Sequence, residues 1–184
     1  LSGSSLKLIE AGAPVALLVD GAHGMAADIL KINPACKVIG RCYDDGMFGD
    51  PVGQWALHGD SPEGAAERWL VDKRPDTGEE SALARIQRHP EIKVWTSVNE
   101  PVLGDYKREA ESVRIKARWL ARFEAYLCDR FTGLGLKRVI YNFSVGNPAK
   151  PSEFPDVWFA LLPGLQAAHA NGGMLGLHEY GDVT

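Results

Sequence analysis

The sequence alternates short apolar runs with longer amphipathic segments, and this alternation constrains the fold more than any other feature. The apolar runs predict strands at residues 15–20, 37–43, 92–98, 137–143 and 174–180. Strands that alternate with helical segments of about ten or more residues are typical of a parallel sheet with right-handed crossovers. The run at 15–20 is apolar up to its last residue, which predicts a strand buried on both faces. The predicted fold class is α/β.

The segments between the apolar runs carry helix start and stop signals. Ser61 followed by Pro62 is a typical helix opening, with serine as the N-cap and proline at the first helical position. Gly133 and Gly135 are expected to end the longest helix. The predicted helices cover residues 6–11 (the end of a helix), 24–33, 61–71, 79–88, 109–131 and 153–170. No linker-like stretch interrupts the pattern, so residues 1–184 are predicted to form a single domain.

Charge and cysteine content argue against several kinds of partner. The formal net charge is −4 and the charges are scattered, which disfavours nucleic acid or an anionic membrane surface as a partner. No apolar run approaches the roughly 20 residues that span a bilayer. Cys36, Cys42 and Cys128 have the spacing of neither a disulfide framework nor a zinc site, so we expect buried thiols. Asp20 and His23 lack a third ligand at matching spacing, and no metal or cofactor is predicted. The compartment and the oligomeric state are not readable from the sequence.

Polar residues cluster just past several predicted strand ends, which favours a (β/α)8 TIM-type barrel over a doubly wound open sheet. A barrel draws its chemistry from the carboxyl ends of many strands, whereas an open sheet concentrates its site at one switch point. Five strands are too few for a complete barrel, so we expect an incomplete one in which strands 2–6 are visible. A compact sheet of five or six strands is the alternative. The clustered residues are Asp20, Arg41, Tyr43, Asp44, Asn99, Glu100, Asn142, Ser144, His178, Glu179 and Tyr180.

The motif Asn99-Glu100-Pro101 directly follows the predicted strand 92–98. It resembles the motif on the fourth strand of the clan A glycoside hydrolases, TIM-barrel enzymes that cleave β-linked sugars. The resemblance implies that Glu100 is the general acid/base and that Asn99 binds the sugar 2-hydroxyl. Such an acid must stay protonated until it meets a poor leaving group, and Trp95 and Pro101 are apolar neighbours that would raise its pKa. A surface turn after an ordinary strand is the alternative.

A second group of residues, His178 and Tyr180, resembles the His and Tyr that line the sugar subsite near strand 6 in this clan. Their two-residue spacing points both side chains to one face, and Glu179 to the other. His178 is equally compatible with a structural histidine at the barrel end. The clan's nucleophile is a second glutamate at strand 7. It is predicted to lie beyond Thr184, or Glu179 replaces it, or hydrolysis has been lost.

Three further residues are weaker candidates for contact with substrate. Arg41 resembles the strand-end arginine that orients the nucleophile in many of these barrels, although an ion pair with Asp44 or Asp45 is an equal alternative. Asn142 is expected either to face the cleft or to cap the next turn. Trp55 is expected to stack on a pyranose ring or to act as a packed lid.

The predicted function is that of a retaining glycosidase, a hydrolase of carbohydrate metabolism and polysaccharide degradation that takes a β-linked oligo- or polysaccharide as its substrate. One alternative is a non-catalytic carbohydrate-binding barrel that has lost the nucleophile. Another is an aldolase or a phosphate-binding isomerase, which would require a strand-end lysine or a glycine-rich phosphate loop. Lys37, Lys93 and Lys137 all lie at strand starts instead.

Overall fold

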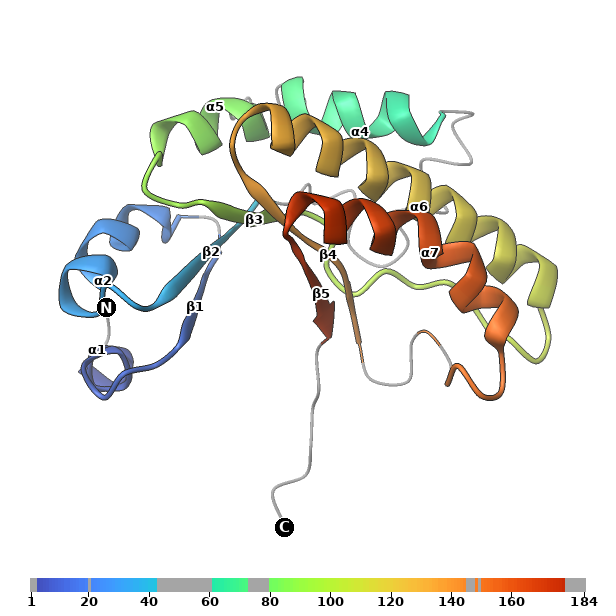
Figure 1. Ribbon diagram of the computed structural model, residues 1–184, viewed down its shortest axis with the longest axis horizontal. Coiled ribbons are helices and arrows are strands. Elements are labelled where there is room, and N and C mark those ends of the chain that lie inside the picture. Colours follow the sequence, from blue (N-terminus) through green and yellow to red (C-terminus); the bar gives the residue numbers. More distant parts are fainter. Residues whose placement is uncertain are drawn as a thin grey trace, which may run out of the picture.

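The strands form one parallel sheet that curls into a half-barrel (Figure 1). The computed structural model describes residues 3–19, 21–42, 61–72, 80–144, 148 and 150–177. The sheet contains β1 to β5 in sequence order, all parallel, and it curls through 198°. A doubly wound sheet would reverse its strand order, and this sheet does not. The α/β class and the parallel sheet are therefore confirmed. The strands are β1 (Val15–Leu18), β2 (Lys37–Arg41), β3 (Val94–Thr96), β4 (Lys137–Phe143) and β5 (Met174–Leu177).

The helices interleave with the strands and follow the outer side of the curled sheet (Figure 1). Ser61 is the predicted N-cap, since its side chain accepts a hydrogen bond from the Gly64 backbone nitrogen at 3.0 Å. Gly135 ends the longest helix as predicted, with a left-handed φ of +69° that favours glycine. The helices are α1 (Gly3–Glu10), the 3-10 turn η1 (His23–Met25), α2 (Ala26–Ile32), α4 (Pro62–Val71), α5 (Ala82–Arg88), α6 (Ala110–Gly133) and α7 (Pro155–Asn171).

The main hydrophobic core lies between the outer face of the sheet and the helices. Trp95 of β3 is completely buried there, and its indole nitrogen donates to the Ile92 carbonyl at 3.0 Å. The neighbouring strand makes room for this ring at Gly40, where a Cβ would lie only 2.4 Å from the indole. Large apolar side chains of the helices and of β4 complete the core: Leu70, Leu120, Phe123, Leu127, Phe131 and Ile140.

The pairing register separates residues that face the helices from residues that face the inside of the half-barrel. Gly40, Trp95 and Arg138 are register partners on the helix-facing side, so Arg41, Thr96 and Val139 share the inner side.

Burial on the inner side is uneven along the sheet. Every residue of β3 is buried, but the side chains of Val15 and Leu17 on β1 and of Val19 just after it are 50%, 47% and 38% exposed. The prediction that the run at 15–20 is buried on both faces is therefore wrong for β1. The physical reason is that, within the described residues, only the helix-facing side of this edge strand is covered, where Leu18 is buried.

All three cysteines are buried and free, as predicted. Burial raises the pKa of the Cys128 thiol from 9.0 to about 12, because desolvation disfavours the thiolate. The charge of Arg138 opposes this rise, and those of Glu124 and Asp129 add to it. Folding therefore favours the neutral thiol. The resulting contribution to stability is complete below pH 9 and is lost as the pH rises towards 12.

Replacing Cys128 with alanine should make the protein less sensitive to alkaline pH. pH 10 is one pH unit above the pKa of the thiol in the unfolded chain. At this pH, ionisation of the thiol in the unfolded state should lower the free energy of unfolding of the wild type by about 1.4 kcal/mol. The alanine variant loses on the order of 1 kcal/mol of packing at neutral pH, but its stability should decline less between about pH 7.5 and pH 10. Urea unfolding at both pH values measures the two declines. Equal losses of stability in the two proteins between these pH values would contradict this assignment. Tyr141, whose pKa burial also raises, is present in both proteins, so it cannot make their losses differ.

Candidate active site

The carboxyl ends of β2, β3 and β4 bring together four of the residues that the sequence singled out. Arg41 ends β2, Asn99 and Glu100 follow β3, and Asn142 lies near the end of β4. Because parallel strands end at the same edge of a sheet, residues from separate parts of the chain meet there. The other four candidates, Trp55, His178, Glu179 and Tyr180, lie outside the described residues and stay predictions.

A hydrogen bond connects Arg41 to the turn after β3. Its Nη1 donates to the Oδ1 atom of Asn99 at 2.6 Å. Arginine can only donate, so the oxygen of the Asn99 amide faces Arg41 and its NH2 group faces away as a donor. Asp44 and Asp45, the alternative partners of Arg41, lie outside the described residues.

Asn142 joins the end of β4 to the end of β3. Its Nδ2 donates to the Val98 carbonyl at 2.7 Å and also to Thr96 Oγ1, which in turn donates to the Val139 carbonyl at 2.9 Å. The backbone oxygen of Asn142 accepts a hydrogen bond from the Glu100 nitrogen at 3.0 Å. Asn142 is buried on the inner side, and the NH2 group of its side chain bridges two strands.

The backbone at this edge is in a conformation that residues with a Cβ rarely adopt. Glu100, Tyr141 and Asn142 have φ angles of +51°, +70° and +42°, and they are the non-glycine residues with positive φ in the described part of the chain. The pairing of β4 with β5 is irregular between Ile140 and Phe143, as at a β-bulge. Each such residue costs on the order of 1–3 kcal/mol, and such residues cluster at active and ligand-binding sites. The clustering here therefore marks the same edge that the polar residues mark.

His23 contacts the backbone of Arg41 in the candidate site, although the sequence suggested it only as one of two metal ligands. It is buried, and its Nε2 lies 3.1 Å from the Arg41 carbonyl oxygen. Its ring lies 5.1 Å from the ring of Trp95. The Trp95 ring packs over Gly40 on the helix-facing side. The sequence had instead suggested that Trp95 is an apolar neighbour of the Glu100 carboxyl. Pro101, the second predicted neighbour of that carboxyl, is buried.

Gly176 of β5 leaves the space that Asn142 occupies. A Cβ at position 176 would lie 2.1 Å from Asn142 Oδ1 and 3.0 Å from its Cα. Real Cβ atoms are essentially never found that close, so either Asn142 or β5 would have to shift. The glycine had no recognised role in the sequence, because the contact depends on the register between two strands.

Replacing Gly176 with alanine should lower the free energy of unfolding by about 1–3 kcal/mol, the usual cost of overpacking. It should also remove the hydrogen bonds that the Asn142 side chain donates. The matched control is Gly24→Ala, because a Cβ at position 24 would meet no atom within 4 Å. Urea unfolding compares the two variants, and NMR signals of the Asn142 side-chain amide report the displacement. Equal stabilities and an unchanged amide would show that the contact is not tight.

Among the residues described, no group of three or more His, Cys, Asp or Glu side chains is arranged to hold a metal ion. In the same part of the chain, no helix has both the length and the apolar character needed to cross a bilayer. Comparisons with protein-family models, with curated proteins and with solved structures gave no match.

Proposed function

We propose that this chain supplies five strands of a (β/α)8 barrel and that the barrel is a retaining glycosidase acting on a β-linked oligo- or polysaccharide. The observation that carries the proposal is the convergence of Arg41, Asn99, Glu100 and Asn142 on one strained edge of the sheet. In this proposal Glu100 is the general acid/base, and carbohydrate is the ligand.

The curvature of the sheet supports a closed eight-stranded barrel. Five strands make four steps between neighbours, so a curl of 198° is about 50° per step. Eight equal steps around a ring are about 45° each. Roughly 160° remains, which fits the four steps that three more strands would make.

Apolar side chains at the two edges of the sheet also support closure. Val15 and Leu17 face the inside of the half-barrel from β1, where side chains of opposite strands would cover them in a complete barrel. On β5, Leu175 and Leu177 are 38% and 51% exposed. Leu175 pairs with Ile140 on the helix-facing side, where a helix after β5 would cover it.

The chemistry of glycoside cleavage fits the residues at the carboxyl edge. A glycosidic oxygen is a poor leaving group, and a carboxylic acid must protonate it as the bond breaks. In a retaining enzyme the same carboxyl then acts as the base that activates water. Glu100 is proposed for both steps. The Asn99 amide, held through its oxygen by Arg41, offers its NH2 group to a sugar hydroxyl beside the acid.

The test is hydrolysis of a panel of aryl β-glycosides and β-linked oligosaccharides by the protein as encoded, with any flanking sequence kept. We expect hydrolysis, with a first-formed product of retained anomeric configuration in NMR spectra. The partner carboxylate, Glu179 or another residue, should then lie about 5–5.5 Å from Glu100. Binding of the oligosaccharides without hydrolysis would overturn the enzyme in favour of a non-catalytic carbohydrate-binding barrel. The absence of both binding and hydrolysis would overturn the glycosidase and the carbohydrate-binding barrel alike.

A further inference from the structure

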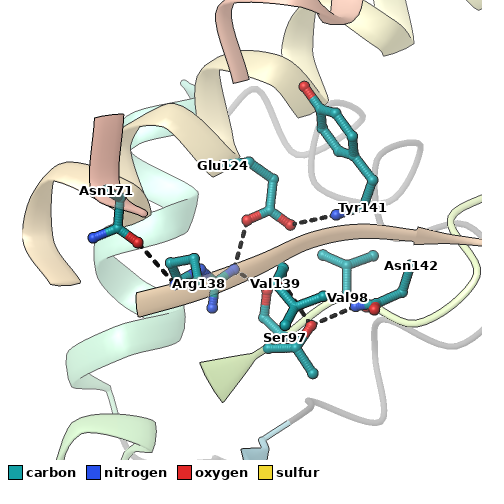
Figure 2. A network of polar contacts seen from close by, with 9 residues as sticks. Ser97, Val98, Glu124, Arg138, Val139, Tyr141, Asn142 and Asn171 are labelled. Carbon is teal, nitrogen blue, oxygen red and sulfur yellow. Dashed lines mark hydrogen bonds and ion pairs between the residues drawn. The ribbon is translucent and has the colours of Figure 1, made fainter. Parts of the chain in front are cut away.

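A buried ion pair lies on the helix-facing side of the strands that form the candidate site (Figure 2). Glu124 of α6 and Arg138 of β4 have no exposed side-chain surface, and Arg138 Nη2 lies 2.5 Å from Glu124 Oε2. The same Nη2 donates to Ser97 Oγ at 2.7 Å. The other carboxylate oxygen, Oε1, accepts from the backbone nitrogen of Tyr141 at 3.4 Å. Glu124 therefore connects a charged pair to the main chain of the bulge.

Tyr141 lies within the bulge and does not have the backbone conformation of a regular strand. Its φ of +70° is left-handed, and the β4–β5 register shifts around it. Its N–H points to the helix side and is donated to Glu124, as Figure 2 shows. A carboxylate is a stronger acceptor than a neutral carbonyl. The Tyr141 hydroxyl also donates to the Leu161 carbonyl on α7 at 2.6 Å. Contacts with two helices therefore hold both the backbone nitrogen and the side-chain hydroxyl of Tyr141.

The conformation of Tyr141 determines where the next residue, Asn142, can lie. Asn142 also has a left-handed φ, and its side chain reaches the Val98 carbonyl on the inner side. Its carbonyl oxygen accepts the Glu100 N–H at 3.0 Å. If Tyr141 relaxed towards a regular strand, Asn142 would rotate away from both contacts, and the backbone of Glu100 would lose its partner.

We infer that Glu124 is a positioning residue for Glu100, acting through Tyr141 and Asn142, while Arg138 compensates its buried charge. The inference rests on the proposed function for its catalytic meaning, because Glu100 needs positioning only if its carboxyl reacts. Its structural content is separate: the acceptor that Glu124 offers to Tyr141 holds the Glu100 backbone in place.

Two double variants separate the acceptor from the ion pair. Both contain Arg138→Met, and a methionine suits the site because Trp69 and Phe131 flank the guanidinium at 5.5 and 4.9 Å. In the first, Glu124→Gln keeps a carbonyl oxygen that can accept from Tyr141. In the second, Glu124→Met removes every acceptor at that place. Neither variant leaves an unpaired buried charge, so both should fold.

The readouts are amide hydrogen exchange at Glu100 and the kinetics of β-glycoside hydrolysis. With the glutamine variant, protection of the Glu100 amide and kcat should stay within about threefold of the wild type, since the acceptor is retained. With the methionine variant, the Glu100 and Tyr141 amides should exchange at least about tenfold faster. Its kcat should fall roughly 10- to 100-fold with little change in KM.

Two results would overturn the inference. One is a methionine variant whose Glu100 amide is as protected as that of the wild type, which would leave the ion pair a stabilising contact only. The other is a glutamine variant that loses as much protection as the methionine variant, since the acceptor would then be irrelevant. A wild type without hydrolytic activity would remove the proposed function alone, because hydrogen exchange at Glu100 still decides the positioning.

Discussion

Replacing Glu100 with glutamine should lower the rate of hydrolysis of β-glycosides with poor leaving groups by about 10²- to 10⁴-fold, the usual contribution of a general acid. Glutamine has nearly the same shape and keeps the backbone contact with Asn142, but it has no proton of suitable acidity. Steady-state kinetics on alkyl or oligosaccharide β-glycosides measure the loss. A variant as active as the wild type would show that Glu100 is not the acid.

The leaving group distinguishes a lost acid from a damaged site. A dinitrophenolate departs without protonation, so the first step with a dinitrophenyl β-glycoside should be almost unaffected in the Glu100→Gln variant. The second step should still be slow, because the same carboxyl activates water, and added azide, which needs no base, should restore turnover. Glu111→Gln, the same change at an exposed position of α6, is the matched control and should behave as the wild type. Equal losses of kcat/KM, which reports the first step, with both kinds of substrate would contradict an acid role.

The sequence predicted the strands well because each apolar run is local and each is bounded by turn residues. The runs at 37–43 and 137–143 both contain the observed strands β2 (Lys37–Arg41) and β4 (Lys137–Phe143). The sequence could not show which face of each strand is covered, because that depends on neighbours. Leu17 is as apolar as Leu18, yet one is 47% and the other 6% exposed.

For the candidates in the described part of the chain, the sequence also predicted that they meet at the carboxyl edge, because parallel strands all end there. Arg41 and Asn99 are 58 residues apart, and strand-end position alone suggested that they are neighbours. The bulge at Tyr141 was not predictable, since an aromatic residue in an apolar run favours a regular strand. Asn142 gave a weak signal, because asparagine tolerates left-handed backbone better than most residues.

The buried pair behind the site was missed for a similar reason. Arg138 is the second residue of a predicted strand, and a charged residue there usually indicates solvent. Its partner Glu124 lies on the apolar stripe of the long helix, between Leu120 and Cys128, but the stripe does not say which cation it would meet. Only the packing of α6 on β4 brings the two charges together, and no sequence spacing specifies that contact.

Breaking this pair on one side should strongly destabilise the protein. Arg138→Met should lower the free energy of unfolding by about 3–5 kcal/mol, because it leaves the Glu124 carboxylate buried without its cation. In a chain of this size that corresponds to a melting temperature roughly 10 °C lower. Thermal and urea unfolding measure both quantities.

Removing both charges should cost far less than removing one. Two nitrogens of Arg138, Nε and Nη1, find no acceptor among the described residues, so the pair itself is incompletely satisfied. Replacing such pairs by apolar side chains of similar volume is often neutral or stabilising. We therefore expect Glu124→Met with Arg138→Met to regain most of the stability that either single variant loses, giving a coupling of several kcal/mol in a double-mutant cycle. Additive losses would mean that the two charges do not compensate each other, and then Glu124 would need another cation to remain buried beside Tyr141.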